Sequence, residues 1–143
     1  MKKNFVAILA CFVLIAVSTA CKKSVNSGSS LTIENLAGTY GLKALVWTYN
    51  GININVYDSV PDCERDNLAR LNTDKTVNFI DAGIVCDPPE NEDGTWDLRN
   101  DSLIFSTNFT SAKIQSFDGK TLVLSGTPDG QPGVTATTTL EKQ

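Results

Sequence analysis

Apolar side chains recur at every second position from Leu36 onward, in short runs separated by turn residues. This two-residue period puts alternate side chains on opposite faces of an extended backbone, which is typical of half-buried β-strands and not of helices. Ile52, Ile54 and Val56 show the period clearly, and Asn50-Gly51 comes just before them. Because Asn-Gly between two alternating runs is a strong hairpin signal, the sequence predicts a β-hairpin here.

The rest of the chain continues the pattern. We expect about eight to ten antiparallel strands in one all-β domain, which closes into an up-and-down barrel of about eight strands or forms a sandwich. Closure is favoured because it removes exposed sheet edges. The only helix expected is a single turn within 30–36, capped by Ser30 or Thr32. The further predicted strands are 68–71, 76–81, 84–86, 95–98, 102–106, 113–117, 121–125 and 134–140.

The N-terminus has the pattern of a targeting signal. Lys2 and Lys3 precede an uncharged run at 5–17, which is shorter than the roughly 20 residues needed to span a bilayer as a helix and fits a secretory signal. The segment 18–21, Ser-Thr-Ala-Cys, resembles the lipobox of bacterial lipoproteins, in which Cys21 receives a diacylglycerol and the chain is cut before it. The alternative is an ordinary signal peptide that leaves Cys21 as a free thiol.

Cleavage before Cys21 predicts a signal peptide at 1–20, a flexible tether at 21–30 and the domain at 31–143. The tether is rich in serine and lysine and has almost nothing to bury. Two or more acyl chains, palmitate among them, would hold the protein firmly on a membrane. Since Lys22 and not aspartate follows the cysteine, we expect the outer membrane, with the periplasmic or surface face left open.

Charge and composition exclude several functions. Without residues 1–20, ten basic side chains face sixteen acidic ones, a formal charge of −6, so nucleic acid is not an expected partner. The chain has no histidine, which removes Ser-His-Asp and Cys-His catalysis and His-ligated metals. We therefore expect no enzymatic activity and no cofactor.

The densest acidic run is 87–94, with Asp97 beyond it. Carboxylates before a glycine can hold calcium, but the alternating spacing of a calcium loop is missing and Pro88 and Pro89 interrupt the run. The sequence therefore predicts a solvated acidic loop and no metal site.

Cys63 and Cys86 are the cysteines of the domain. A secretory signal sends them to an oxidising compartment, where we expect a disulfide between them that stabilises by roughly 3 kcal/mol. A redox pair is the alternative, but no Cys-x-x-Cys spacing supports it.

Six short motifs follow one another along the domain. They are Leu36-Ala37-Gly38-Thr39-Tyr40, Cys63, Thr73-Asp74-Lys75-Thr76, Cys86, Gly94-Thr95-Trp96-Asp97-Leu98 and Asn100-Asp101-Ser102-Leu103. Their order resembles that of the small lipocalin-like lipoprotein domains of Bacteroides-type bacteria. The resemblance covers about 36–142 and implies a barrel of about eight strands with an N-terminal lipid anchor, but no particular ligand. The sequence departs from the family pattern at Tyr40, where a tryptophan is usual, and at Asp74-Lys75, where Asp-Gly is usual.

Two functions remain open. The leading hypothesis is a non-enzymatic, lipid-anchored envelope protein whose barrel binds a small apolar or amphiphilic molecule, although the length of the domain slightly favours a barrel filled by its own side chains. On an unbroken strand, Tyr40, Leu42, Ala44 and Val46 would share the inner face. The residues expected to line a ligand site are Leu42, Val46, Ile54, Val56, Phe79, Phe105 and Leu124.

The alternative is an accessory protein that docks on another envelope protein. Trp47, Tyr49 and Tyr57 cluster around the first hairpin, and Trp47 is out of phase with the inner face, so it would point outward and bind the partner. A bulge in the strand would instead turn Trp47 inward.

Overall fold

The computed structural model describes residues 29–107 and 111–143. The predicted signal peptide 1–20, the lipidation site Cys21 and most of the tether 21–30 lie outside these residues. The elements are α1 (Ile33–Leu36), β1 (Gly38–Tyr49), β2 (Ile52–Asn55), η1 (Tyr57–Ser59), α2 (Asp62–Arg65), β3 (Leu68–Leu71), β4 (Thr76–Ile80), β5 (Glu92–Arg99), β6 (Ser102–Phe105), β7 (Ser111–Phe117), β8 (Thr121–Gly126) and β9 (Val134–Lys142).

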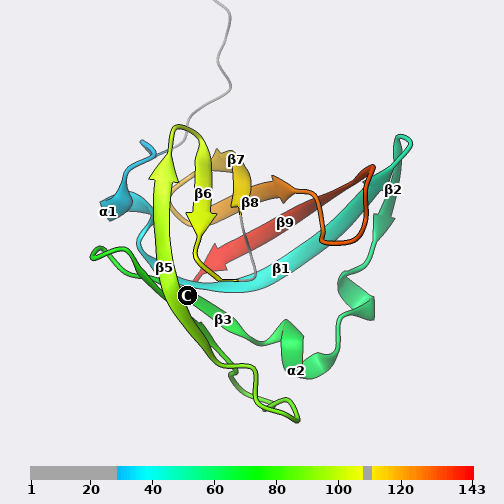
Figure 1. Ribbon diagram of the computed structural model, residues 1–143, viewed down its shortest axis with the longest axis horizontal. Coiled ribbons are helices and arrows are strands. Elements are labelled where there is room, and N and C mark those ends of the chain that lie inside the picture. Colours follow the sequence, from blue (N-terminus) through cyan, green and yellow to red (C-terminus); the bar gives the residue numbers. More distant parts are fainter. Residues whose placement is uncertain (1–28, 108–110) are drawn as a thin grey trace, which may run out of the picture.

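The strands form one antiparallel sheet that closes on itself (Figure 1). Their order is β2-β1-β3-β4-β5-β6-β7-β8-β9, and β1 also pairs with β9. Eight strands therefore make a closed barrel and β2 is an extra strand, which confirms the predicted all-β barrel and excludes the sandwich. The predicted hairpin at Asn50-Gly51 is also present, because both residues have the positive φ angles, 49° and 78°, of this turn.

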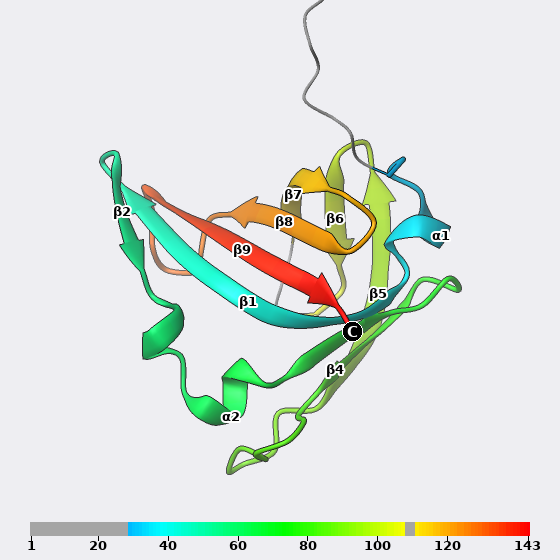
Figure 2. The ribbon, with the colours of Figure 1, turned by 180° about the vertical axis from the view of Figure 1, so that it is seen from behind.

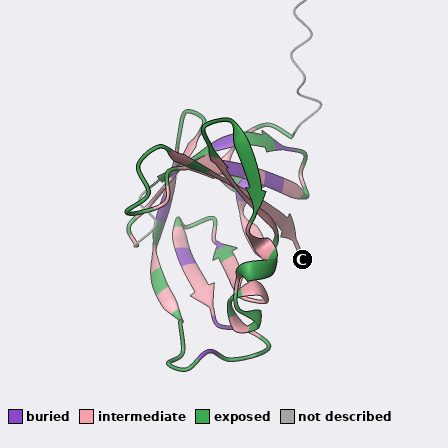
Figure 3. Ribbon diagram, turned by 90° about the vertical axis from the view of Figure 1, so that its right-hand side faces the viewer, coloured by how far each residue is buried: buried purple, intermediate pink, exposed green. Residues whose placement is uncertain are grey.

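One edge of β1 is shared by two strands. β3 pairs with Gly38–Gly41 and β2 with Val46–Tyr49, while β9 occupies the opposite edge along nearly the whole strand. The segment 56–67, which contains η1 and α2, connects β2 to β3. As a result β2 pairs with β1 alone, and all four of its residues are exposed, as the green strand in front in Figure 3 shows.

A β-bulge in β1 changes which residues face the core. Leu42 pairs with Leu140 but Ala44 pairs with Thr139, so Lys43 is an extra residue. Beyond it, Leu45 and Trp47 lie on the inner face. Their cross-strand partners on β9, Thr138 and Ala136, face inward, and the threonines that alternate with them face outward. The expectation that Ala44 and Val46 face inward with Leu42 is therefore wrong: both lie on the outer face.

The β4–β5 loop and the helices also differ from expectation. Residues 84–86, predicted as a strand, belong to the loop 81–91. The short helices η1 and α2 were not predicted at all, whereas α1 lies where a helical turn was expected. Thr32 is its cap and accepts a hydrogen bond from the Asn35 N–H at 3.2 Å. Among the described residues no helix is long and apolar enough to cross a membrane.

One end of the barrel, here called the closed end, is plugged. Its strands are joined by the short turns 72–75, 100–101 and 118–120, and α1 lies across it. The Leu36 side chain is fully buried, and the Tyr40 hydroxyl donates to the Leu36 carbonyl at 2.7 Å. The buried core is concentrated here and consists of Leu36, Tyr40, Leu71, Val77, Trp96, Leu103, Ile114, Phe117, Leu122 and Leu124.

The opposite end, here called the open end, carries the longer connections. These are the segment 56–67, the β4–β5 loop 81–91, the β6–β7 connection and the β8–β9 loop 127–133. The β1–β2 hairpin and the β4–β5 loop lie on either side of α2 in both Figure 1 and Figure 2. Within residues 29–107 and 111–143, the exposed large apolar side chains lie at this end, namely Tyr49 (51%), Ile52 (65%), Ile54 (51%), Ile84 (58%) and Val85 (60%).

Candidate functional site

The candidate site is the inner face of the barrel near the open end, which we call the mouth. Two pairs of strands supply its side chains. In β1 the bulge turns Leu45 and Trp47 inward, and Trp47 pairs with Ile54 of β2. In β4 and β6, Phe79 and Phe105 lie on the same face as the fully buried Val77 and Leu103. The mouth consists of Leu45, Trp47, Ile54, Phe79, Glu92 and Phe105.

The two phenylalanines of the mouth pack against each other. Their ring centroids are 6.1 Å apart with the planes tilted by 56°, an arrangement that aromatic pairs favour. Both side chains are only partly buried and rest on the core beneath them. They form an apolar floor between the filled closed end and the open end.

The predicted ligand-binding residues fall in different places. Leu42, Ile54, Phe79, Phe105 and Leu124 all face inward, but Leu124 is 7% exposed and belongs to the filled core. Val46 faces outward, opposite Asn55 and Thr137, because the bulge shifts the strand by one residue. Val56 lies beyond β2 at the start of η1. Sequence reasoning missed Leu45, which the bulge brings inward.

The three aromatics expected to bind a partner are not on one surface. Trp47 lies on the inner face, so the prediction that it points outward is wrong. Tyr49 is two residues further along the same face, at the rim, where it is half exposed. Tyr57 is in η1, with the guanidinium of Arg65 lying 5.8 Å from its ring centroid.

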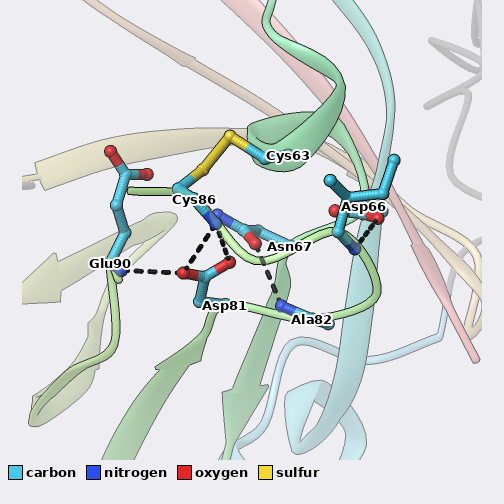
Figure 4. Close-up of a disulfide and its surroundings, with 8 residues drawn as sticks. Cys63, Asp66, Asn67, Asp81, Ala82, Cys86 and Glu90 are labelled. Carbon is cyan, nitrogen blue, oxygen red and sulfur yellow. Dashed lines mark hydrogen bonds between the residues drawn. A yellow bond between two sulfur atoms is a disulfide. The ribbon is translucent and has the colours of Figure 1, made fainter. Parts of the chain in front are cut away.

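A disulfide braces one side of the open end (Figure 4). Cys63 of α2 is bonded to Cys86 of the β4–β5 loop, which confirms the predicted pairing. Hydrogen bonds join the same two segments, because the Ala82 N–H donates to Asn67 Oδ1 at 3.1 Å and the Ile84 N–H to Asp66 Oδ2 at 2.8 Å. The segment 56–67 and the β4–β5 loop are therefore held together.

Asp81 organises the β4–β5 loop from within. Its side chain is 9% exposed and accepts hydrogen bonds from the Cys86 N–H at 3.1 Å and the Glu90 N–H at 2.9 Å. A buried carboxylate is costly unless donors surround it, and these amides supply them. Asp81 thus has a structural role in shaping the loop beside the mouth.

The acidic run 87–94 divides between two elements. Asp87 and Glu90 are in the exposed loop, whereas Glu92 begins β5 and pairs with Phe79 on the inner face. Within the described residues no group of three His, Cys, Asp or Glu side chains could hold a metal ion. The sequence pattern places Glu92 in the solvated loop, and only its register with Phe79 shows that it faces inward.

Two surface depressions lie away from the mouth. One, of about 470 Å³, is beside the closed end, between the segment at Ser29 and β7. The other, of about 450 Å³, crosses β5 and β6 near Asp97 and Ile104, and Phe105 is the one mouth residue that borders it. They are alternative places for a small molecule to rest.

Comparison with known proteins gives the family. The family model described as "Lipocalin-like domain" matches residues 36–124, which is more than half of the chain and runs from the end of α1 into β8. A search of curated proteins found no match. The matched span holds six complete strands of the barrel, β1 and β3–β7, together with the first part of β8, in agreement with the architecture described above. The chain belongs to the lipocalin-like domain family.

Proposed function

We propose that this protein binds a small apolar or amphiphilic molecule in the mouth and is held on a cell envelope by a lipid at Cys21. The observation that carries the binding proposal is the uneven filling of the barrel. The core fills the closed end, while inward-facing apolar side chains near the open end are left partly exposed. Leaving Ile54 half exposed on an inner face forgoes burial energy, which a bound apolar molecule would recover.

The architecture of the family supports the same proposal. A lipocalin-like barrel is a ligand-binding type of fold, and a barrel of eight strands has room for one small ligand when its side chains do not fill it. Trp47, Phe79 and Phe105 place aromatic side chains on the inner face near the open end. We propose a binding role without catalysis.

The anchor proposal rests on the N-terminal sequence and on where the chain enters the barrel. Residue 31 packs against the core next to α1, so the tether joins the barrel at the closed end. A lipid on Cys21 would therefore leave the open end directed away from the membrane. We propose the outer membrane of a bacterium as the site of anchoring, following the lipobox and Lys22.

The binding proposal is tested by titrating the full chain with the neutral fluorescent probe N-phenyl-1-naphthylamine. We expect probe fluorescence to rise on binding and the emission of Trp47 to change. Ile54→Asp places a charge on the inner face of β2 and should abolish binding. Asn53→Asp makes a similar change on the neighbouring outward residue and should leave binding intact. Equal effects of the two substitutions would contradict a site in the mouth.

The anchor proposal has its own test. Cells that produce the full chain are given labelled palmitate and then fractionated. We expect label and protein together in the membrane fraction, and neither after Cys21→Ser. If the Cys21→Ser protein still takes up label, or if the native protein takes up none, the lipidation proposal fails.

Partner docking remains a second proposal because β2 has a free edge. The Val56 N–H donates to the Leu45 carbonyl. In an antiparallel pair the backbone groups of alternate residues face the neighbouring strand, so those of Ile52 and Ile54 also face β1. The backbone groups of Asn53 and Asn55 therefore point away from the barrel. An exposed, uncharged edge of this kind accepts an added strand. Asn53→Pro removes one outward N–H, and it should abolish co-purification of a partner while the barrel stays folded.

A further inference from the structure

Charge is divided unequally between the two ends of the barrel. Four carboxylates lie in the segment 56–67, three in the β4–β5 loop, two at the start of β5 and one in the β8–β9 loop, whereas the same segments hold one basic side chain, Arg65. That arginine is already paired with Asp62. Seven of the eight basic side chains in the described residues lie elsewhere in the barrel. The open end is therefore strongly acidic.

Half of the six described carboxylates elsewhere in the barrel are compensated by ion pairs. Asp97 pairs with Lys75 at 2.8 Å, Asp101 with Lys113 at 3.4 Å and Glu141 with Lys120 at 2.5 Å. The open end differs, because Asp62 is the only one of its carboxylates in an ion pair within the described residues. A mostly unpaired negative charge thus surrounds the apolar side chains of the mouth, and a charge there attracts cations and repels anions over about 10 Å at moderate salt.

Glu92 brings that charge onto the inner face. In β5 it alternates with the exposed Asp93 and lies on the same face as Gly94 and the buried Trp96. It pairs across the strands with Phe79, whose ring meets Phe105. Within the described residues, no hydrogen bond or ion pair involves the Glu92 carboxylate. A carboxylate next to an aromatic side chain can hold a cation by charge and by contact with the ring face.

We propose that the ligand of the mouth is a cationic amphiphile, an apolar chain or ring system with one ammonium-type group, and that Glu92 receives the cation. This inference rests on the proposed function and specifies the ligand class for the same site. The apolar part would lie against Trp47 and Ile54, and the positive group would lie between Glu92 and the Phe79–Phe105 pair. Anionic amphiphiles such as fatty acids are disfavoured, because their carboxylate would meet Glu92 and the acidic loops.

The test compares three probes with the same eight-carbon chain: octyltrimethylammonium, octanol and octanoate. Binding to the full chain carrying Cys21→Ser is followed by Trp47 emission and isothermal calorimetry at low ionic strength. We expect octyltrimethylammonium to bind at least about tenfold more tightly than octanoate, as one charge interaction in a partly dry site allows. This ratio of affinities should shrink in about 0.5 M salt, where charges are screened more strongly, since part of the preference for the cation comes from the exposed acidic loops.

Adjacent carboxylates on opposite faces of β5 provide the matched control. Glu92→Gln should reduce the preference for the cation several-fold, whereas Asp93→Asn removes the same charge from the outer face and should change it little. The inference is overturned if octanoate or octanol binds as tightly as octyltrimethylammonium, or if the two substitutions act alike, and the proposed function then stands. If none of the three probes binds, the proposed function fails together with the inference.

Discussion

Tyr40 closes the barrel at the position where the lipocalin-like pattern usually has tryptophan. Its ring is 1% exposed, its hydroxyl donates to the Leu36 carbonyl, and the Lys142 ammonium lies 5.7 Å from the ring centroid. Burial raises the pKa of the Tyr40 hydroxyl well above its usual value, so the group remains a donor at neutral pH. A single hydroxyl therefore ties α1 to β1.

Tyr40→Phe leaves the Leu36 carbonyl without its buried donor. We expect a loss of about 1 kcal/mol in the free energy of unfolding, the usual value of such a bond, measured by urea denaturation. Tyr49→Phe is the control, since Tyr49 is half exposed at the open end and its change should be close to zero. Similar losses in both variants would show that the hydroxyl of Tyr40 does not stabilise the closed end.

Glu141 links stability to pH. Hydrogen bonds from Lys120 and Lys43 hold the pKa of its carboxyl below the ordinary value of 4.5. A lowered pKa in the folded state stabilises the protein above the unfolded value, and this contribution is lost as the pH falls through the folded value. Glu141→Gln should therefore unfold at lower urea than the native chain at pH 7. Below about pH 4 the two midpoints should converge, and a gap that is the same at both pH values would contradict the pairing.

At the scale of the elements, the bulge at Lys43 determines which side chains of β1 line the mouth. As the extra residue of the bulge, it keeps Tyr40 and Leu42 inward below it and Leu45 and Trp47 inward above it. Deleting Lys43 would restore an unbroken period and turn the large side chains outward. We expect the deletion to abolish cooperative unfolding in thermal denaturation, whereas Lys43→Ala, which keeps the residue count, should fold. A stable Lys43 deletion with native binding would contradict this role.

The disulfide makes a prediction for two elements at once. Reducing it, or changing Cys63 and Cys86 to serine, should lower the free energy of unfolding by roughly 3 kcal/mol in the chain-entropy model. Because the bond joins α2 to the β4–β5 loop, hydrogen exchange should also accelerate in 56–67 and 81–91 before the closed end is affected. Uniform acceleration across all strands would contradict a local bracing role.

Much of the fold, but less of the site, could be predicted from the sequence. Alternation, Asn50-Gly51 and the turn residues identify most strands, because these signals are local. The bulge could not be predicted, because residues 44–47 are apolar at every position and fit either phase. Glu92 was missed for a related reason: only its pairing with Phe79, a contact between strands, distinguishes an inward carboxylate from a solvated loop.

At the scale of the whole molecule, the barrel is divided along its axis. One end is filled, braced by ion pairs and attached to the N-terminal segment, and the other is apolar inside and acidic around its rim. This division agrees with our proposal that the protein is held at one end and receives a ligand at the other. The two surface depressions, near Ser29 and across β5–β6, offer the ligand other positions.

The most direct measurement is photolabelling of the full chain with an alkylammonium probe that carries a diazirine at the end of its chain, followed by peptide mapping. We predict labels on Leu45, Trp47, Ile54 and their neighbours on the inner face, and protection of these sites by excess unlabelled probe. Labels confined to Ser29–Leu31, or to the outer residues Asp97 and Ile104 of β5–β6, would contradict the claim that the open end of the barrel is the binding site.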